Sequence, residues 1–300
     1  RSPTDNVSHL FDLANKKKRL KFVYGDLNDY SSIFKIIKTE KPDFIYHLAA
    51  QSFPLASFNM AEITFNTNIN GTYNLLNSIK DSNIKPLIHI CSSSEVFGKV
   101  SKKDIPIDEK TNYHPASPYA ISKVGTDLIS KFFFEAYNLK TLTTRMFTHT
   151  GPRRGDYFAE SSFAKQIAMI EKKMIPPIIK VGNLKSLRTY SDVRDAVRAY
   201  YMLLNKKPRP GQVYNIGGTY SCTVGHMLKT LIKNSEYNKK IKIHNDIDRF
   251  RPIDANLQIP NTKKFRKHYG WKPQIPFKKT MMDLLNYWRA KVSINNYLDR

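Results

Sequence analysis

The sequence predicts an α/β fold with a doubly wound parallel sheet, in which helices cover both faces. Short apolar runs, typical of strands buried on both faces, occur over residues 44–48 and 87–91, and a further strand is predicted over residues 141–147. Helical segments separate these runs, as over residues 118–137, where Ser117 is the expected cap. Strands that alternate with helices indicate parallel pairing, and such sheets bind ligands at the carboxyl ends of their strands.

Further elements are predicted on either side of this centre. A strand is predicted over residues 20–24 and a helix over about residues 30–39, with Asp29 as its cap. A helix over about residues 161–172 and a strand with its turn over residues 213–218 follow later. The last predicted helix is amphipathic. Its apolar face, which we expect in a core, comprises Phe277, Met281, Leu284, Leu285 and Trp288.

The composition allows a sizeable core and excludes several classes of protein. The 300 residues are 41% hydrophobic, enough for one large α/β unit or two small domains. No apolar stretch approaches the ~18 residues of a membrane helix, so we expect no membrane partner. The two cysteines, Cys91 and Cys222, have neither metal-binding nor redox spacing. We therefore predict no metal site and a cytoplasmic location.

The net charge of +24 is the one feature that suggests nucleic-acid binding. The lysines are scattered in small groups, such as residues 16–18, 172–173 and 263–264. No helix-turn-helix, RNA-recognition or zinc-finger pattern accompanies them. We therefore expect no nucleic-acid partner, and a solvated basic surface that attracts a doubly phosphorylated substrate.

The stretch over residues 87–123 holds side chains suited to catalysis. Ser93 and Glu95 follow a predicted strand, and Tyr119 and Lys123 lie four residues apart on one helix face. A free tyrosine titrates near pH ~10, and we expect the Lys123 ammonium and a cationic nicotinamide ring to favour the phenolate. With the Ser93 hydroxyl on the same substrate oxygen, this set can take a proton from a sugar alcohol while a hydride leaves its carbon.

These residues resemble the catalytic set of the extended short-chain dehydrogenases/reductases, the NAD-dependent epimerase/dehydratase family. The run Ser-Ser-Ser-Glu-Val-Phe-Gly over residues 92–98 is similar to Ser-Thr-Ser-Glu-Leu-Tyr-Gly of the GDP-mannose 4,6-dehydratases. Residues 148–155 resemble both the Asn-His-Glu-Ser-Pro-Arg-Arg-Gly run of those dehydratases and the Asn-His-x-Gly-Pro run of the GDP-4-keto-6-deoxy-mannose reductases. Residues 181–188 are more similar to the reductases.

The resemblance implies a Rossmann-like fold with a smaller C-terminal substrate-binding domain. Residues 1–150 would form the cofactor-binding domain and residues 151–300 mostly the nucleotide-sugar domain, with about residues 188–205 returning to the first. The family opens with a strand and a Gly-x-x-Gly-x-x-Gly turn that meets the cofactor pyrophosphate, and this sequence has no such turn. We therefore expect the first βα unit to lie upstream of residue 1, and these 300 residues alone to bind cofactor poorly.

The cofactor implied by the resemblance is NADP. Arg1 and Ser2 would lie at the adenosine 2′-phosphate, although a frayed terminus is an equal alternative for Arg1. Asp26 would accept a hydrogen bond from the adenine amino group, and for Asn68 a structural hydrogen-bonding role is preferred. The residues assigned to the cofactor are Arg1, Ser2, Asp26, Leu27, Ala49, Ala50, Gln51, Asn68, Tyr119, Lys123, His149 and Arg154.

Six further residues are assigned by the resemblance to the substrate. They are Ser94, Thr148, Val181, Asn183, Arg188 and Arg251. Arginine forks match phosphate oxygens, so for Arg188 we prefer contact with phosphate over a surface pair with Asp192. Both related families have Asn where this chain has Thr148, so the amide usually found there is missing.

The function implied is that of a GDP-mannose 4,6-dehydratase, which converts a GDP-hexose to its GDP-4-keto-6-deoxy form. Tyr119, with Lys123 and Ser93, would take the C4 hydroxyl proton, and Glu95 would take the C5 proton before water leaves C6. The other role considered for Glu95 is hydrogen bonding to loop amides. The resemblance also implies a homodimer or homotetramer.

Two other functions remain open at this point. A GDP-4-keto-6-deoxy-mannose 4-reductase, or another C4 oxidoreductase of a GDP-sugar, needs only Ser93, Tyr119 and Lys123. The non-enzyme alternative is a cofactor-free scaffold or a basic RNA-binding relative. The presence of Glu95 together with the other three residues argues against the scaffold, which has no need of them.

Overall fold

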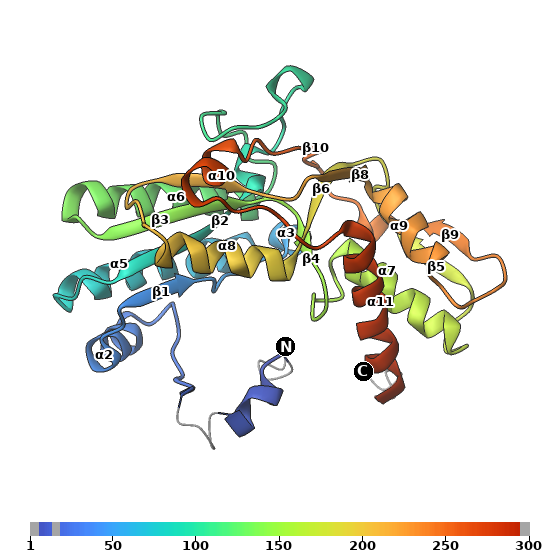
Figure 1. Cartoon of the computed structure of the whole chain (residues 1–300), viewed down its shortest axis with the longest axis horizontal. Helices are drawn as coiled ribbons and strands as arrows, with labels where there is room; N and C mark the ends of the chain where they lie inside the picture. Colours follow the sequence, from blue (N-terminus) through green and yellow to red (C-terminus); the bar gives the residue numbers. More distant parts are fainter. Residues whose placement is uncertain (1–5, 14–18, 295–300) are drawn as a thin grey trace.

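The computed structural model describes residues 6–13 and 19–294, and a parallel four-stranded sheet lies at its centre (Figure 1). The strands, in spatial order, are β1 (Phe44–His47), β2 (Leu87–Ser93), β3 (Lys140–Met146) and β7 (Val213–Ile216). Every neighbouring pair in this sheet is parallel. The two inner strands, β2 and β3, are largely buried, as the apolar run of β2 predicted for that strand.

Helices pack on one face of the sheet around Ile88 and Ile90 of β2. These helices are α2 (Tyr30–Glu40), α5 (Gly71–Asp81) and α6 (Pro118–Tyr137). Two of them begin at the caps that the sequence predicted. The Asp29 carboxylate accepts from the Ser31 amide at 2.9 Å, and the Ser117 hydroxyl accepts from the Ala120 amide at 3.0 Å.

The other face of the sheet is covered by α8 (Val193–Asn205) and α10 (Lys263–Tyr269). Their buried side chains pack with Leu142 and Met146 of β3. Because successive residues of a strand point to opposite faces, one strand serves two cores. Helices on both faces confirm the doubly wound α/β fold.

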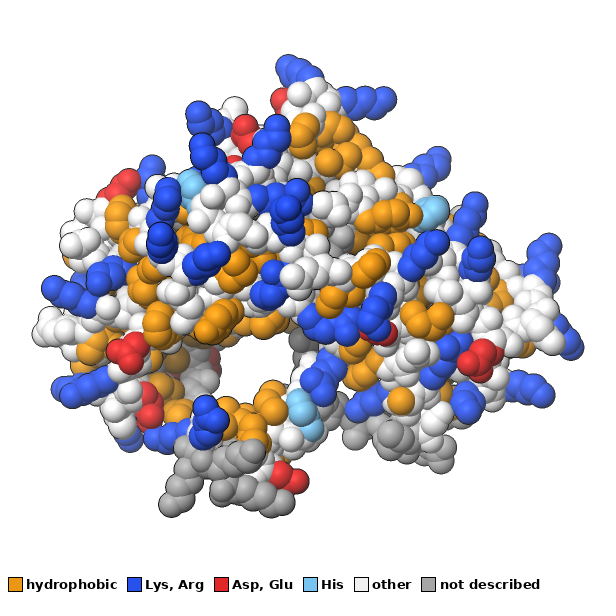
Figure 2. Space-filling model, in the orientation of Figure 1, with side chains coloured by type: hydrophobic (Ala, Val, Ile, Leu, Met, Phe, Trp, Pro, Cys, Tyr) orange, Lys and Arg blue, Asp and Glu red, His pale blue; other side chains and the backbone are white. Residues whose placement is uncertain are grey.

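The strand predicted over residues 20–24 is wrong. This segment has no strand structure, and Phe22, Val23 and Tyr24 are exposed. A strand exists through its ladder of hydrogen bonds, and these residues pair with no strand in the described ranges. Figure 2 shows an opening through the molecule on this side of the sheet. The segment therefore has the composition of a strand, but no neighbouring strand in the described ranges pairs with it.

Residues 44–48 do form a strand, but its predicted burial on both faces is wrong. β1 pairs with β2 and with no other described strand. As a result Phe44, Tyr46 and Leu48 are exposed. An edge strand loses the cover that a second neighbour and its helix would give.

The C-terminal half builds a second core. Its helices are α7 (Ala159–Glu171), α9 (Val224–Lys233) and α11 (Phe277–Ile294). Its strands are β4 (His149–Thr150), β5 (Ile178–Val181), β6 (Leu187–Asp192), β8 (Tyr220–Thr223), β9 (Lys242–Asn245) and β10 (Leu257–Gln258). The five apolar side chains predicted for the last helix are all buried in this core. Figure 1 shows these elements beside the central sheet.

The segment after β6 returns to the sheet, because α8 packs in the cluster of β3 and β7 and not in the C-terminal core. On this packing we propose a division near residue 150, with about residues 188–205 on the sheet side. The boundary matters for the site, because a ligand at the carboxyl ends of β2 and β3 would contact residues from both sides of it.

The other helical segments are short. They are α3 (Pro54–Ser57), α4 (Ala61–Phe65), the π-helical turn η2 (Asn66–Asn70) and the 3₁₀ turns η1 (Ser8–Leu10), η3 (Ser94–Phe97), η4 (Lys102–Asp104) and η5 (Ile247–Arg249). Within residues 6–13 and 19–294, no helix combines the length and apolar character that a bilayer span requires. Lys and Arg side chains are spread over the face seen in Figure 2, as their scatter along the sequence suggested.

Candidate active site

A cavity of about 480 Å³ lies at the carboxyl ends of β2 and β3, between the two cores. All four predicted catalytic residues line it: Ser93, Glu95, Tyr119 and Lys123. Ser93 is the last residue of β2 and the cap of η3, since its hydroxyl accepts from the Glu95 amide at 3.2 Å. The end of one strand thus fixes the hydroxyl and the carboxylate together.

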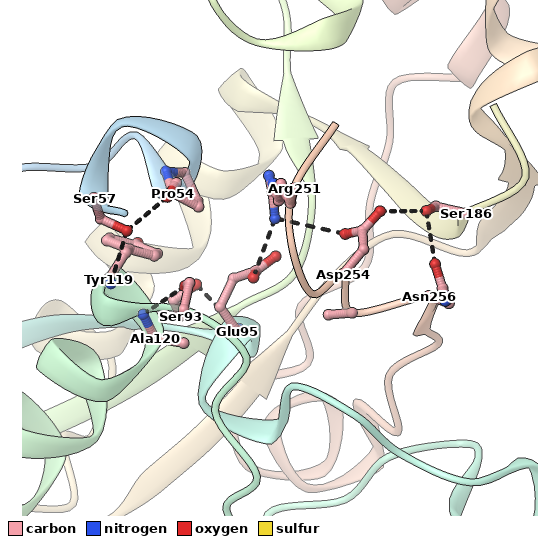
Figure 3. A network of polar contacts seen from close by, with 12 residues as sticks. Pro54, Ser57, Ser93, Glu95, Tyr119, Ala120, Ser186, Arg251, Asp254 and Asn256 are labelled. Carbon is pink, nitrogen blue, oxygen red and sulfur yellow. Dashed lines mark hydrogen bonds and ion pairs between the residues drawn. The ribbon is translucent and has the colours of Figure 1, made fainter. Parts of the chain in front are cut away.

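Tyr119 enters the cavity from the first turn of α6. Its amide donates to the Ser57 hydroxyl at 3.1 Å, and that hydroxyl donates to the Pro54 carbonyl at 2.6 Å (Figure 3). The cap and the bond to α3 therefore fix the backbone from which the Tyr119 side chain extends. The side chain is buried but lines the cavity, so a ligand there can reach it.

The pKa of the Tyr119 phenol is raised above its ordinary value. Burial is the largest cause, and the negative charge of Glu95 adds to it. A hydrogen bond with Ser93 and the positive charge of Arg154 act in the opposite direction and are outweighed. The phenol of Tyr119 is therefore protonated in this structure, and the phenolate expected from Lys123 together with a cationic nicotinamide ring stays a prediction.

Lys123 is turned toward the strand. Its ammonium donates to the Cys91 carbonyl at 2.8 Å and lies 6.0 Å from the centre of the Tyr119 ring. Burial lowers the pKa of Lys123. An ammonium has three donors, so two remain for a ligand that lies between the lysine and the phenol.

A chain of charged groups crosses the cavity opposite Tyr119 (Figure 3). Arg251 lies between Glu95, at 3.5 Å, and Asp254, at 3.7 Å. Asp254 also contacts Arg188 at 3.2 Å, so one carboxylate holds two guanidinium groups. Burial raises the pKa of Asp254, but Arg188 and Arg251 together bring it below its usual value. The carboxylate of Glu95 thus contacts Arg251 and not loop amides.

Most of the predicted substrate residues also line the cavity. Ser94, Thr148, Asn183, Arg188 and Arg251 all do. The alternative for Arg188, a surface pair with Asp192, is wrong, because Arg188 is mostly buried and Asp192 pairs with Arg194. Val181 is a correction: it is fully buried in the C-terminal core and does not line the cavity. Strand alternation turns this side chain inward, and the next residue, Gly182, reaches the cavity.

The predicted cofactor residues divide into two groups. Ala50, Tyr119, Lys123, His149 and Arg154 line the cavity. Asp26, Leu27, Ala49, Gln51 and Asn68 do not. Arg1 and Ser2 lie outside the described residues. The cavity thus contains the residues expected near the nicotinamide ring of the cofactor. The residues expected near its adenosine end do not line the cavity.

Asn68 has the structural role that the sequence favoured. Its side-chain oxygen accepts from the Gln51 amide at 2.8 Å, and its nitrogen donates to the Gln51 carbonyl and to the Ser122 hydroxyl. These bonds tie the loop after β1 to α6. Asp26 is exposed and accepts from the Asn28 amide at 2.9 Å, as a turn residue does.

The described residues fit one part of a nicotinamide dinucleotide. Two donors of Lys123, beside Tyr119 and His149, suit the hydroxyl groups of the nicotinamide ribose. The glycine turn that binds a pyrophosphate in such enzymes is not among the described residues. The fit therefore covers the reacting end of the cofactor.

Sequence reasoning gave no site role to three charged residues that line the cavity, namely Glu160, Arg249 and Asp254. Arg249 and Asp254 flank the predicted Arg251 and belong to one Arg-rich run, which was a usable signal. Glu160 comes two residues after the aromatic pair of Tyr157 and Phe158 and gives no such signal. Its place in the cavity depends on the packing of α7.

Buried histidines predict a loss of stability in acid. Burial lowers the pKa of His47 to about 4 and that of His89 to about 3, with the charge of Lys123 adding to both. A depressed pKa in the folded state gives stability that is complete above the unfolded value near ~6.5 and is lost as the pH falls. We expect the free energy of unfolding to drop by about 1.4 kcal/mol per pH unit for each histidine between about pH 6 and about pH 4.

The measurement is urea unfolding at several pH values across that range. The variant His89→Gln should reduce the slope of stability against pH by about one proton, whatever it does to stability itself. The exposed His244 provides a matched control, His244→Gln, for which the slope should stay as in the wild type. A slope that is the same in both variants would show that His89 is not the group that takes up the proton.

Comparison with known proteins places this chain among enzymes of nucleotide sugars. The model of the GDP-mannose 4,6 dehydratase family matches residues 1–284. The chain is 30% identical to GDP-mannose 4,6 dehydratase of Drosophila melanogaster, over 94% of this chain and 75% of that protein. It is 28% identical to GDP-6-deoxy-D-mannose reductase of Pseudomonas aeruginosa, over 84% of this chain and 82% of that protein. A solved structure of RMD from Pseudomonas aeruginosa complexed with NADPH has a TM-score of 0.83 and 26% identity, over 93% of this chain and 95% of that one.

Proposed function

Because the chain belongs to the GDP-mannose 4,6-dehydratase family, we propose that it converts a GDP-hexose, in the first place GDP-mannose, to its GDP-4-keto-6-deoxy form with NADP. The observation that carries the proposal is the position of Glu95, which lines the same cavity as Ser93 and Tyr119. An alcohol oxidation needs the hydroxyl and the phenol only. A carboxylate beside them is what removal of a carbon-bound proton requires.

Tyr119 and Ser93 are proposed to hold the C4 hydroxyl of the sugar, with Tyr119 as its base. When bound, the nicotinamide cofactor supplies the hydride acceptor for C4 and the hydride donor for C6. Because burial raises the pKa of Tyr119, its deprotonation depends on positive charge brought near the phenol. Two N–H groups of the Lys123 ammonium are free to donate to a ribose hydroxyl. Such a bond would turn the ammonium from the Cys91 carbonyl toward the Tyr119 phenol.

Glu95 is proposed to take the C5 proton once C4 is a ketone, since a carbonyl acidifies the adjacent carbon. The C6 hydroxyl then leaves as water with that proton, and C5 takes up a proton when hydride is delivered to C6. In the structure its carboxylate contacts Arg251 at 3.5 Å. A diphosphate carries more negative charge than one carboxylate and offers guanidinium groups a bidentate partner. Binding of the substrate diphosphate to Arg188 and Arg251 would therefore compete for Arg251 and release Glu95 for proton transfer.

The proposal is tested by incubating the full-length protein with GDP-mannose and a catalytic amount of NADP. We expect a 4-keto sugar nucleotide in large molar excess over the cofactor, because the cofactor is regenerated in each turnover. The reductase alternative has support of its own, since a reductase is among the relatives and a structurally similar chain binds NADPH. Turnover that occurs only with a keto-sugar and stoichiometric NADPH would replace the dehydratase by the reductase.

We also propose a homodimer or homotetramer in the cytoplasm. Ile121, Leu128 and Phe132 are exposed on one face of α6, at the spacing of a helical stripe, and a second copy could cover them. Both cysteines are free, which suits a reducing compartment. A monomeric mass in solution would contradict the oligomer.

A further inference from the structure

Glu160 is a buried carboxylate that the proposed reaction does not use. It lies in the first turn of α7, is 7% exposed and lines the cavity. In the part of the chain that the structure describes, no hydrogen bond or ion pair holds its carboxylate. The Glu160 oxygens are not among the fully buried side-chain atoms, so they face the cavity, and a carboxylate there without a protein partner can accept from a ligand that donates to it.

The wall around Glu160 belongs to the C-terminal core. The Gln166 side chain bonds both the amide of Lys180, at 2.8 Å, and its carbonyl, at 3.2 Å, which fixes α7 against β5. Gly182 follows β5 and faces the cavity, and a Cβ atom there would lie 2.5 Å from the Arg249 carbonyl oxygen. The start of α7, the end of β5 and the backbone of Arg249 therefore meet at one end of the cavity.

Arg249 brings donors to the same wall. Its guanidinium donates to the Ser162 hydroxyl at 3.0 Å, one turn into α7, and the residue lines the cavity. Its ion-pair partner Asp246, at 3.3 Å, contacts only the Nε atom of the guanidinium group. Five N–H donors in a guanidinium leave some for a ligand. This end of the cavity therefore offers an acceptor pair from Glu160 and donors from Arg249.

The substrate has three parts, and two are already assigned. The sugar meets Ser93 and Tyr119 on the sheet side, and the diphosphate suits the guanidinium groups of Arg188 and Arg251. The nucleoside must then lie against the C-terminal core, where Glu160 and Arg249 are. Guanine presents a ring N–H next to an exocyclic amino group, and a carbonyl next to N7. Uracil has a ring N–H between two carbonyls, and adenine and cytosine have no ring N–H.

We propose that Glu160 reads the base of the substrate, its two carboxylate oxygens accepting from N1–H and the 2-amino group of guanine while Arg249 donates to the carbonyl edge. This inference rests on the proposed GDP-sugar substrate and adds the residue that selects its base. Tyr190 supports the placement. Its hydroxyl is buried without a partner among the described residues, and the charge of Glu160 acts on it. Glu160 therefore lies between the buried Tyr190 of the C-terminal core and the cavity.

The test is calorimetric binding of nucleoside diphosphates to the full-length protein. The set is GDP, IDP, which lacks the 2-amino group, and XDP, which has a carbonyl there. The wild type should bind GDP at least about tenfold more tightly than IDP, since one charge-assisted hydrogen bond is lost. In Glu160→Gln the amide can accept from N1–H and donate to a 2-carbonyl, so this variant should bind XDP more tightly than GDP.

Glu135→Gln is the matched control, because Glu135 is an exposed glutamate on α6 outside the cavity. It should keep the wild-type order of the three nucleotides. Equal affinity of the wild type for GDP and IDP overturns the proposal without any variant. So does an equal loss of all three nucleotides in Glu160→Gln, with the thermal midpoint as the check on folding. If Glu160→Gln does not fold, Glu160→Asp should keep the preference for GDP over IDP at lower affinity, and loss of that preference counts against the proposal.

These outcomes are separate from those of the proposed reaction. Selective GDP binding without a 4-keto product would support the role of Glu160 in base selection and contradict the proposed dehydratase activity. A 4-keto product without selection among the bases would do the reverse.

Discussion

Replacing Tyr119 with Phe is expected to lower kcat for GDP-mannose by about 10²–10⁴-fold, the usual contribution of a positioned acid–base group. The physical reason is that the phenol is the proposed proton acceptor for the C4 hydroxyl, and Phe keeps the ring and its packing. KM should change little, because we propose that the diphosphate binds Arg188 and Arg251 and not Tyr119. Initial rates of 4-keto product formation over a range of GDP-mannose concentrations measure both constants.

The control for this variant is Tyr201→Phe, which removes a phenol from the exposed side of α8. Its kcat should match the wild type. If Tyr119→Phe keeps more than about a tenth of the wild-type kcat, the phenol is not the base. The position of the hydroxyl group in the cavity would then need another explanation, such as substrate orientation by Ser93.

Replacing Glu95 with Gln is expected to separate the two halves of the reaction. Gln keeps the shape and the hydrogen bond of the Glu95 amide to Ser93 but cannot take the C5 proton. Oxidation at C4 should continue, whereas the release of the 4-keto-6-deoxy product should fall by about 10²–10⁴-fold. In rapid mixing with excess GDP-mannose, the absorbance of reduced nicotinamide should rise toward one equivalent per active site and then stay there.

The Glu95 variant also breaks the contact with Arg251, so binding must be followed separately. KM measures this contribution, and we expect it to stay within a few-fold of the wild type because Asp254 still holds Arg251. Glu135→Gln again provides an isosteric exchange far from the cavity. Product formation at the wild-type rate in Glu95→Gln would assign the C5 proton to another group and remove the main argument for a dehydratase over a reductase.

The central site could be predicted from the sequence because its signals are local. Ser93 ends a buried strand, and Ser117 and Pro118 start the helix that carries Tyr119 and Lys123, so short-range rules place all of them. The structure brings these residues to one cavity, as the carboxyl ends of parallel strands should.

The features that could not be predicted depend on contacts between segments that are distant in the sequence. Residues 20–24 have strand composition, but a strand needs a partner, and pairing is not encoded in the segment itself. Val181 and Gly182 differ in role because of strand phase, which a one-residue error reverses. The direction of the Tyr119 pKa shift depends on burial, which spacing between Tyr119 and Lys123 does not report. Glu160 reaches the cavity only through the packing of α7 on β5.

The most direct test of the proposed function follows the hydrogen on C4. GDP-mannose that carries deuterium at C4 is incubated with the full-length protein and catalytic NADP, and the product is analysed by NMR. We expect the deuterium at C6 of the 4-keto-6-deoxy product, because the hydrogen that leaves C4 is returned within the same cavity. Deuterium lost from the product, or found at C6 only when labelled reduced cofactor is supplied from outside, would contradict the assignment of this chain as a dehydratase.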